Sequence, residues 1–262
     1  MRDKQAVFAV VGVLVVVLGF VVLANVFLNR TDAAPPAATS TVSPTPGATS
    51  TPSATPTVKP TLLAGCSAPP KALAAPKKVG QPDLAAAKGK TFTGTITTTC
   101  GPLTIELDGA KAPAAVSSFI NLATTGYYAS SPCHRLTGDV QKLWVLQCGD
   151  PTGTGSGPGP GYHFGVENVP ANDIYPVGTL ALARKGNDPT SNSDQFFIVY
   201  KETKLPAAAS AGGDGNGYTI FGKVTKGMDL VDKIAKAGIN PSDHTSPLAP
   251  ISILSVAVQP KA

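Results

Sequence analysis

Three short segments of the chain carry side chains that could do chemistry together. They supply a guanidinium, primary amides and paired aromatic rings, and they lie at Cys133–Leu136, Leu146–Asp150 and 180–198. In the last segment, alternating leucines lead into a polar loop, and a second strand then presents an amide beside two phenylalanines. A fixed cation beside aromatic rings suits electrostatic catalysis, in which a positioned donor acts on a substrate held in an apolar slot.

These segments, followed by Phe-Gly-Lys-Val at 221–224, resemble the cyclophilin family of peptidyl-prolyl isomerases. Each motif alone is weak, but four of them follow the family's order over about 90 residues. The resemblance covers about residues 91–260 and implies an enzyme that rotates X-Pro bonds in proline-containing polypeptides, with no metal or cofactor. Amide resonance opposes this rotation by about 18–20 kcal/mol, and a donor to the proline nitrogen weakens that resonance.

The resemblance also implies roles for individual residues. Arg135 matches the guanidinium that acts on the proline nitrogen, and its permanent charge and planar geometry suit that role. Gln147 matches the glutamine that orients the substrate and the arginine. His134 is either a catalytic neighbour of the arginine or a hydrogen-bonded structural residue. Phe197 matches the floor of the proline pocket, whereas Phe196 should face the barrel core because side chains alternate along a strand.

Further substrate-binding positions match the family less closely. Ala183 fits the narrow part of the groove, and Arg184 stands where the family commonly carries Asn for a backbone contact to the substrate. Tyr218 takes the place of a histidine at the pocket edge and keeps aromatic bulk with a polar tip. Trp144 and Val145 replace the family's Phe-Met, so we expect an apolar slot of altered shape.

Two departures concern loops beside the expected groove. The segment 136–143 is several residues longer than the family's usual turn. Leu205 replaces the tryptophan of the loop that contacts cyclosporin, and Pro206 follows where leucine is common. We therefore expect weakened cyclosporin binding with isomerase activity retained.

The N-terminal segment described below predicts that the domain is exported, and four cysteines in an exported domain favour two disulfides. Four cysteines allow three pairings. The family fold places the strands of Cys133 and Cys148 side by side, so the resemblance implies a bond between them. Cys66 would then pair with Cys100 and tie the preceding segment to the first hairpin. Free thiols are the alternative.

The pattern of apolar residues predicts the elements that must position these side chains. Alternation over 91–108 around Cys100-Gly101-Pro102 predicts a β-hairpin, and 251–258 reads as a last strand. A helix should begin at Ala112-Pro113 and stop at Gly126, and a second should span Met228–Ala237. Many short strands with two helices predict a mainly β fold with a closed antiparallel barrel. The cyclophilin resemblance implies that this barrel has eight strands and is capped by two α-helices.

The N-terminal region predicts a membrane anchor over residues 1–30. Residues 6–28 carry no charge and would reach about 34 Å as a helix, enough to cross a bilayer core. Arg2 and Lys4 place the N-terminus in the cytoplasm and the rest of the chain outside it. A cleaved signal peptide is the competing interpretation, but its apolar run would be shorter and no convincing cleavage site follows.

Composition divides the remainder of the chain into three parts. Residues 31–65 are rich in Thr, Pro, Ser and Ala and predict a disordered, extended spacer. Residues 66–90 form an Ala/Pro/Lys-rich lead-in, and 91–262 form the catalytic domain. Leu62 to Cys66 resembles a lipoprotein-processing box, but a polar tract precedes it, so we interpret Cys66 as structural.

Charge and motif content narrow the function further. The net charge is +5 with 14% charged residues and no cluster of basic and aromatic residues, which argues against a nucleic-acid partner. The sequence contains no hydrolase elbow, phosphate loop or zinc spacing. We expect a monomeric, single-pass protein of the cell membrane with an extracytoplasmic isomerase domain, in a thick-walled bacterial envelope. The alternatives are a barrel that binds or chaperones proline segments without catalysis, and a purely structural wall protein.

Overall fold

A computed structural model describes residues 60–207 and 212–262 of the chain. Within these ranges it contains eleven strands and two helices. In chain order they are β1 (Thr91–Thr98), β2 (Gly101–Asp108), α2 (Pro113–Thr124), β3 (Ser131–Pro132), β4 (Arg135–Leu136), β5 (Val145–Cys148), β6 (Ile174–Tyr175), β7 (Thr179–Leu182), β8 (Phe196–Val199), β9 (Thr203–Lys204), β10 (Ile220–Lys226), α3 (Met228–Ala237) and β11 (Ser252–Pro260).

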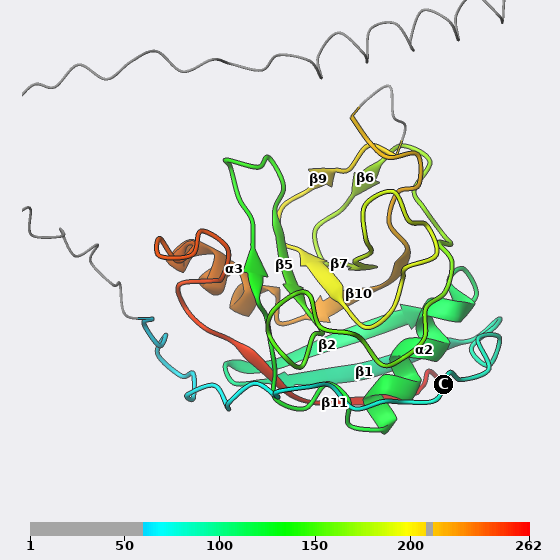
Figure 1. Ribbon diagram of the computed structural model, residues 1–262, viewed down its shortest axis with the longest axis horizontal. Coiled ribbons are helices and arrows are strands. Elements are labelled where there is room, and N and C mark those ends of the chain that lie inside the picture. The colour runs from blue at the N-terminus through cyan, green and yellow to red at the C-terminus, as the bar shows by residue number, and fades with distance from the viewer. Residues whose placement is uncertain (1–59, 208–211) are drawn as a thin grey trace, which may run out of the picture. The chain divides into compact units, whose positions relative to one another are not determined.

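Nine of the strands form one curved antiparallel sheet in the order β3-β11-β1-β2-β10-β7-β8-β5-β4 (Figure 1). Strands β6 and β9 pair separately as a small ribbon. The prediction of a closed eight-stranded barrel is wrong. The edge strands β3 and β4 do not pair with each other, so the sheet is a curled half-barrel. Both edge strands are only two residues long. The Leu136 amide of β4 donates to the carbonyl of Thr245 rather than to β3. The edge strands therefore offer no run of free backbone groups that could complete a ladder.

The predicted hairpin, both predicted helices and the last strand are confirmed. Strands β1 and β2 pair in register from Thr91–Asp108 to Thr98–Gly101. Helix α2 begins with Pro113, whose missing N–H costs nothing in the first turn, and the chain leaves it through Gly126 at φ 68°. Helix α3 presents Val231 and Ile234 to the core and keeps its charged residues outside.

The sheet separates two apolar clusters because successive side chains of a strand point to opposite faces. Phe196 belongs to the main core, where its ring packs edge-on against Phe119 at a centroid distance of 5.6 Å. Phe119 also packs against Phe221 at 5.2 Å, so helix α2 anchors the inner face of the sheet. Phe197 lies in the second cluster on the outer face, as strand alternation predicted.

Residues 60–90 form an irregular segment, here called the strap, which lies along the domain and precedes β1. Cys66 forms a disulfide with Cys100 in the β1–β2 turn. The amides of Leu73 and Val79 donate to the carbonyls of Pro151 and Pro160, at the two ends of a glycine-rich loop. The strap therefore fixes both ends of that loop by hydrogen bonds, although it contains no helix or strand.

In the part of the chain that the structure describes, no helix has both the length and the apolar character needed to cross a bilayer. The predicted anchor at 6–28 and most of the predicted spacer lie outside the described residues.

Candidate active site

Four neighbouring strands align the predicted site residues in one row. Arg135 of β4 lies opposite Gln147 of β5, and Gln147 lies opposite Phe197 of β8. Phe197 in turn lies opposite Ala181 of β7. Residues directly opposite in an antiparallel pair point to the same face, so a cation, an amide and an aromatic ring stand side by side on the outer face.

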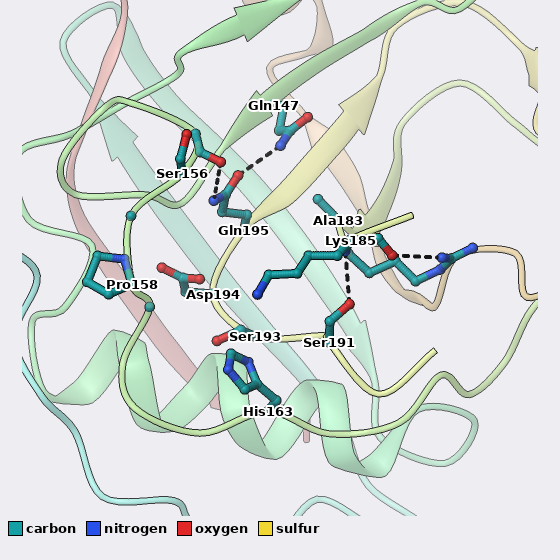
Figure 2. A pocket seen from close by; sticks show the side chains of 14 residues that line it. Gln147, Ser156, Pro158, His163, Ala183, Lys185, Ser191, Ser193, Asp194 and Gln195 are labelled. Atoms are coloured by element: carbon teal, nitrogen blue, oxygen red, sulfur yellow. Dashed lines mark hydrogen bonds between the residues drawn. The ribbon is translucent and has the colours of Figure 1, made fainter. Parts of the chain in front are cut away.

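A chain of hydrogen bonds holds the polar end of this row. Arg135 Nη1 donates to Gln147 Oε1 at 3.2 Å. Gln147 Nε2 in turn donates to Gln195 Oε1 at 2.9 Å, as Figure 2 shows. Gln195 Nε2 completes the chain by donating to the carbonyl of Gly155 at 3.1 Å. Each amide thus has a fixed orientation, and the guanidinium is held at one edge. Gln195 was not among the predicted site residues, and its only sequence signal was its place before the paired phenylalanines.

The guanidinium of Arg135 is half-buried and free of carboxylates. In the described part of the chain, no Asp or Glu forms an ion pair with it. Burial lowers the pKa of Arg135, and the neighbouring Tyr218 opposes that shift. An arginine stays protonated under such a perturbation, so its remaining N–H donors and its charge are available to a ligand.

An apolar cluster adjoins Arg135 and Gln147 on the outer face. Its buried members are Val145, Tyr175, Ala181, Phe197 and Val199, and its partly exposed rim is Leu143, Ala183, Leu205, Tyr218 and Ile220. The rings of Phe197 and Tyr218 meet edge-to-face at 5.6 Å. Tyr175, which the sequence analysis missed, fixes Tyr218 because its hydroxyl donates to the Tyr218 carbonyl and accepts from the Tyr218 amide. This surface can hold an apolar ring beside the guanidinium.

Arg184 turns away from that surface and supports its edge. Its side chain is 1% exposed and forms a two-pronged ion pair with Asp214, with both N–O distances at 2.5 Å. Its Nε donates to the carbonyl of Gly217, and its guanidinium lies 4.8 Å from the centre of the Tyr218 ring. The ion pair holds the pKa of Asp214 well below its usual range. Arg184 therefore positions Tyr218, while Ala183 keeps its place on the apolar rim.

His134 and Trp144 lie outside the row. A Cβ at Gly155 would come within 3.0 Å of His134 Cδ2, so the imidazole packs directly beneath the residue that accepts from Gln195. Its ring nitrogens are buried, and neither makes a hydrogen bond in the described structure, although Pro132 and Gln195 are polar neighbours. Burial accordingly lowers the pKa of His134.

Trp144 is separated from the apolar cluster by strand alternation, since its neighbour Val145 faces that cluster. Its Nε1 donates to Asp139 at 2.9 Å, and the Lys201 amine lies 4.2 Å from the ring centre. The structure therefore does not bring Trp144 together with Phe197, but Leu205 lies on the rim of the cluster, with Pro206 next to it in the chain.

Both expected disulfides are confirmed. Cys133 and Cys148 are joined with a Cα–Cα distance of 4.0 Å, and Cys66 is joined to Cys100. Cys148 directly follows Gln147, and Cys133 precedes Arg135 by two residues. This bond therefore braces the two strands that carry the guanidinium and its amide partner.

Comparison with known proteins assigns the chain to a family. The family model described as "Cyclophilin type peptidyl-prolyl cis-trans isomerase/CLD" matches residues 93–258, which is more than half of the chain. A "Probable peptidyl-prolyl cis-trans isomerase B" of Mycobacterium tuberculosis is 37% identical over 212 residues, covering 74% of this chain and 63% of the relative. The chain thus spans less than two thirds of the length of this mycobacterial relative.

Other relatives are matched over most of their length. A "Peptidyl-prolyl cis-trans isomerase-like 1" of Emericella nidulans is 32% identical over 63% of this chain and 93% of the relative. A crystal structure of a cyclophilin-type peptidyl-prolyl cis-trans isomerase of Cryptosporidium parvum superposes with a TM-score of 0.53 at 31% identity, covering 65% of this chain and 99% of that chain. The matched residues, the curled sheet and the row of Arg135, Gln147 and Phe197 agree: this chain belongs to the cyclophilin-type peptidyl-prolyl cis-trans isomerase family.

Proposed function

We propose that this protein is a peptidyl-prolyl cis-trans isomerase that acts on exported polypeptides. The observation that carries the proposal is the hydrogen-bonded chain from Arg135 through Gln147 to Gln195, held beside an outward apolar cluster. A related Cryptosporidium parvum isomerase was crystallised in the presence of the dipeptide Ala-Pro, which supports a prolyl ligand for the fold.

The geometry supports an electrostatic mechanism. The proline ring packs on Phe197 while Arg135 donates toward the proline nitrogen as the bond twists. In the twisted state the nitrogen lone pair is no longer shared with the carbonyl, so it accepts this hydrogen bond more strongly than in the planar state. Gln147 keeps the guanidinium in register through its own bond to Gln195. The groups that act on the substrate in this account belong to the chain, and no covalent bond is broken.

Replacing the guanidinium tests the proposal. In a prolyl-peptide isomerisation assay on the full-length chain, Arg135→Ala should lower kcat/KM by about 100-fold or more, the loss typical of removing a preorganised donor. Lys233→Ala removes an exposed cation of α3 and should leave kcat/KM unchanged. Unfolding midpoints should match among the three proteins.

The result also separates catalysis from simple binding. If the unmodified chain binds a proline peptide without accelerating its isomerisation, the protein is a binding or chaperone module. If Arg135→Ala keeps full activity with normal folding, the proposed role of the guanidinium is wrong.

We also propose that the protein is a monomer anchored in the cell membrane through residues 6–28, with its isomerase domain outside the cytoplasm. The uncharged run, the basic residues before it and the Pro/Thr-rich spacer support this location. Two disulfides in one domain are also typical of an oxidising compartment. Cell fractionation of the full chain and of a chain lacking residues 1–30 tests the anchor, since only the former should sediment with membranes.

A further inference from the structure

A cavity of about 470 Å³ lies beside the Gln147–Gln195 pair (Figure 2). The glycine-rich loop supplies one wall, and the loop between β7 and β8 supplies the other. Small and hydroxyl-bearing residues dominate the lining, including Ser156, Ser191 and Ser193. The cavity shares Gln147 and Ala183 with the candidate active site, so a polypeptide bound at Arg135 can send a side chain into it.

Asp194 lines this cavity as a buried carboxylate that has no ion-pair partner in the described part of the chain. It is 5% exposed, and its one side-chain donor in the described structure is the Tyr127 hydroxyl, 2.6 Å from Oδ2. The neighbouring buried Asp150 differs, since it accepts from the amides of Thr152, Gly155 and Gly157 as well as from two threonine hydroxyls. Burial raises the pKa of Asp194 to about 6 and the negative charge of Asp150 adds to this shift, while the Tyr127 hydroxyl and the backbone amides of Asp194 and Gln195 oppose it.

The glycine-rich loop leaves the second oxygen of Asp194 open to the cavity. A Cβ at Gly159 would lie 3.5 Å from Asp194 Oδ1 and 3.1 Å from Ser193 Oγ. Gly159 also has φ 66°, a conformation that favours glycine. Any larger residue at this position would cover the carboxylate, so the loop keeps access to it.

Among the described residues, no lysine or arginine forms an ion pair with Asp194. Lys185 extends over the cavity toward the Asp194 side in Figure 2, but it is exposed and forms no ion pair in the described structure. Arg184 is committed to Asp214. The other titratable groups that face Asp194 or the cavity are Tyr127, Tyr128, Tyr162, Asp150 and His163, and none of them is a fixed cation.

We propose that this cavity is a subsite for a lysine or arginine side chain of the polypeptide substrate, with Asp194 as its anionic anchor. The inference rests on the proposed isomerase function and names a preference of the same site. A cationic side chain entering the cavity gives the carboxylate a cationic donor, which the described part of the chain does not supply. Its aliphatic stem passes between the serine hydroxyls and the small rim residue Ala183.

The test compares matched peptides on the full-length chain. Lysine, its neutral isostere norleucine, and glutamate are placed in turn at each of the three positions on either side of proline, and kcat/KM is measured. We expect lysine to exceed norleucine by 5-fold or more at one position. Asp194→Asn should bring that ratio close to 1, while Asp229→Asn, an equal charge change on exposed α3, should keep it.

A second variant keeps the test independent of the folding of Asp194→Asn. Lys185→Ala removes the like charge at the rim, so it should raise the lysine-to-norleucine ratio further. Equal rates for lysine and norleucine at every position overturn the inference while leaving the isomerase proposal intact. A glutamate preference that Lys185→Ala abolishes also overturns it. Absence of turnover with every peptide overturns the proposed function itself.

Discussion

At the scale of single residues, the site depends on side chains that hold other side chains in place. Gln195 is the clearest case, because it accepts from Gln147 and donates to Gly155 in one hydrogen-bonded chain. No hydrogen bond joins it to the guanidinium in the described structure, and it was not among the predicted catalytic residues. We therefore regard it as a positioning residue.

Gln195→Leu should lower kcat about 10-fold with little change in KM, because Gln147 loses the acceptor that fixes its amide. Steady-state kinetics on a prolyl peptide measure both constants. Gln259→Leu changes an exposed glutamine at the end of β11 and serves as the control. A rise in KM with unchanged kcat would instead make Gln195 a substrate-binding residue.

Leu205 offers a test of the predicted weak cyclosporin binding. It stands on the rim of the apolar cluster, where the family carries tryptophan. Leu205→Trp should tighten cyclosporin binding by about 10-fold, because the indole ring adds apolar contact area and an N–H donor that leucine lacks. Inhibition titrations on both proteins measure this change, with Leu254→Trp on exposed β11 as the control. Potent inhibition of the unmodified chain would contradict the expectation.

At the scale of elements, the two disulfides stabilise different parts of the domain. One joins the strap to the first hairpin across 34 residues, and the other braces β4 and β5 across 15 residues. The strap bond is made by the β1–β2 turn rather than by a strand that carries Arg135 or Gln147, and it closes the longer loop. The brace encloses a shorter loop but lies beside Arg135 and Gln147 of the candidate active site.

Replacing both cysteines of each disulfide by serine should separate the contribution of that disulfide to stability from its contribution to activity. Cys66→Ser/Cys100→Ser should lower the free energy of unfolding by about 3–4 kcal/mol, with kcat/KM of a simple peptide nearly unchanged. Cys133→Ser/Cys148→Ser should lower it by about 3 kcal/mol and also reduce kcat/KM. Urea unfolding and the isomerisation assay measure the two effects. Full activity in the second variant would show that the brace does not position Arg135 and Gln147.

At the scale of the whole molecule, Asp194 links stability to pH. Its pKa rises from 3.8 to about 6 in the folded protein, so the folded state holds this proton more tightly than the unfolded state. The stabilising contribution is therefore complete below about pH 4 and is lost as pH rises through 6. Neutral-pH stability is reduced by at most about 3 kcal/mol, an upper bound for one such group.

Asp194→Asn should accordingly be more stable than the unmodified chain at pH 7.5, by about 1–3 kcal/mol. The difference should shrink as pH falls and vanish near pH 3.5, because both residues are then neutral. Urea unfolding across this pH range measures it, and groups common to both proteins cancel in the comparison. Asp229→Asn should show no such pH-dependent gain. A variant that is less stable at every pH would contradict the analysis.

The apolar periodicity was sufficient to predict the first hairpin, both helices, the last strand and the opposite directions of Phe196 and Phe197. These features depend on local rules, namely side-chain alternation, the place of proline in a first turn and helical spacing. The motif resemblance singled out Arg135, Gln147 and Phe197, which the strand register brings into one row, and it led to the correct cystine pairing. Each of these predictions uses neighbours in sequence or motifs whose order is visible in it.

Only the tertiary structure decided how segments far apart in sequence meet. It showed a half-barrel whose two edge strands do not meet, and it placed Trp144 outside the apolar cluster. It also showed that Gln195 holds Gln147 and that Tyr175 holds Tyr218 by hydrogen bonds. It also placed Asp194 in a cavity, beneath a loop whose ends are held by the strap. Strand pairing, burial and the number of donors around a carboxylate are set by residues that fold together from different parts of the chain. A linear pattern carries no measure of those contacts.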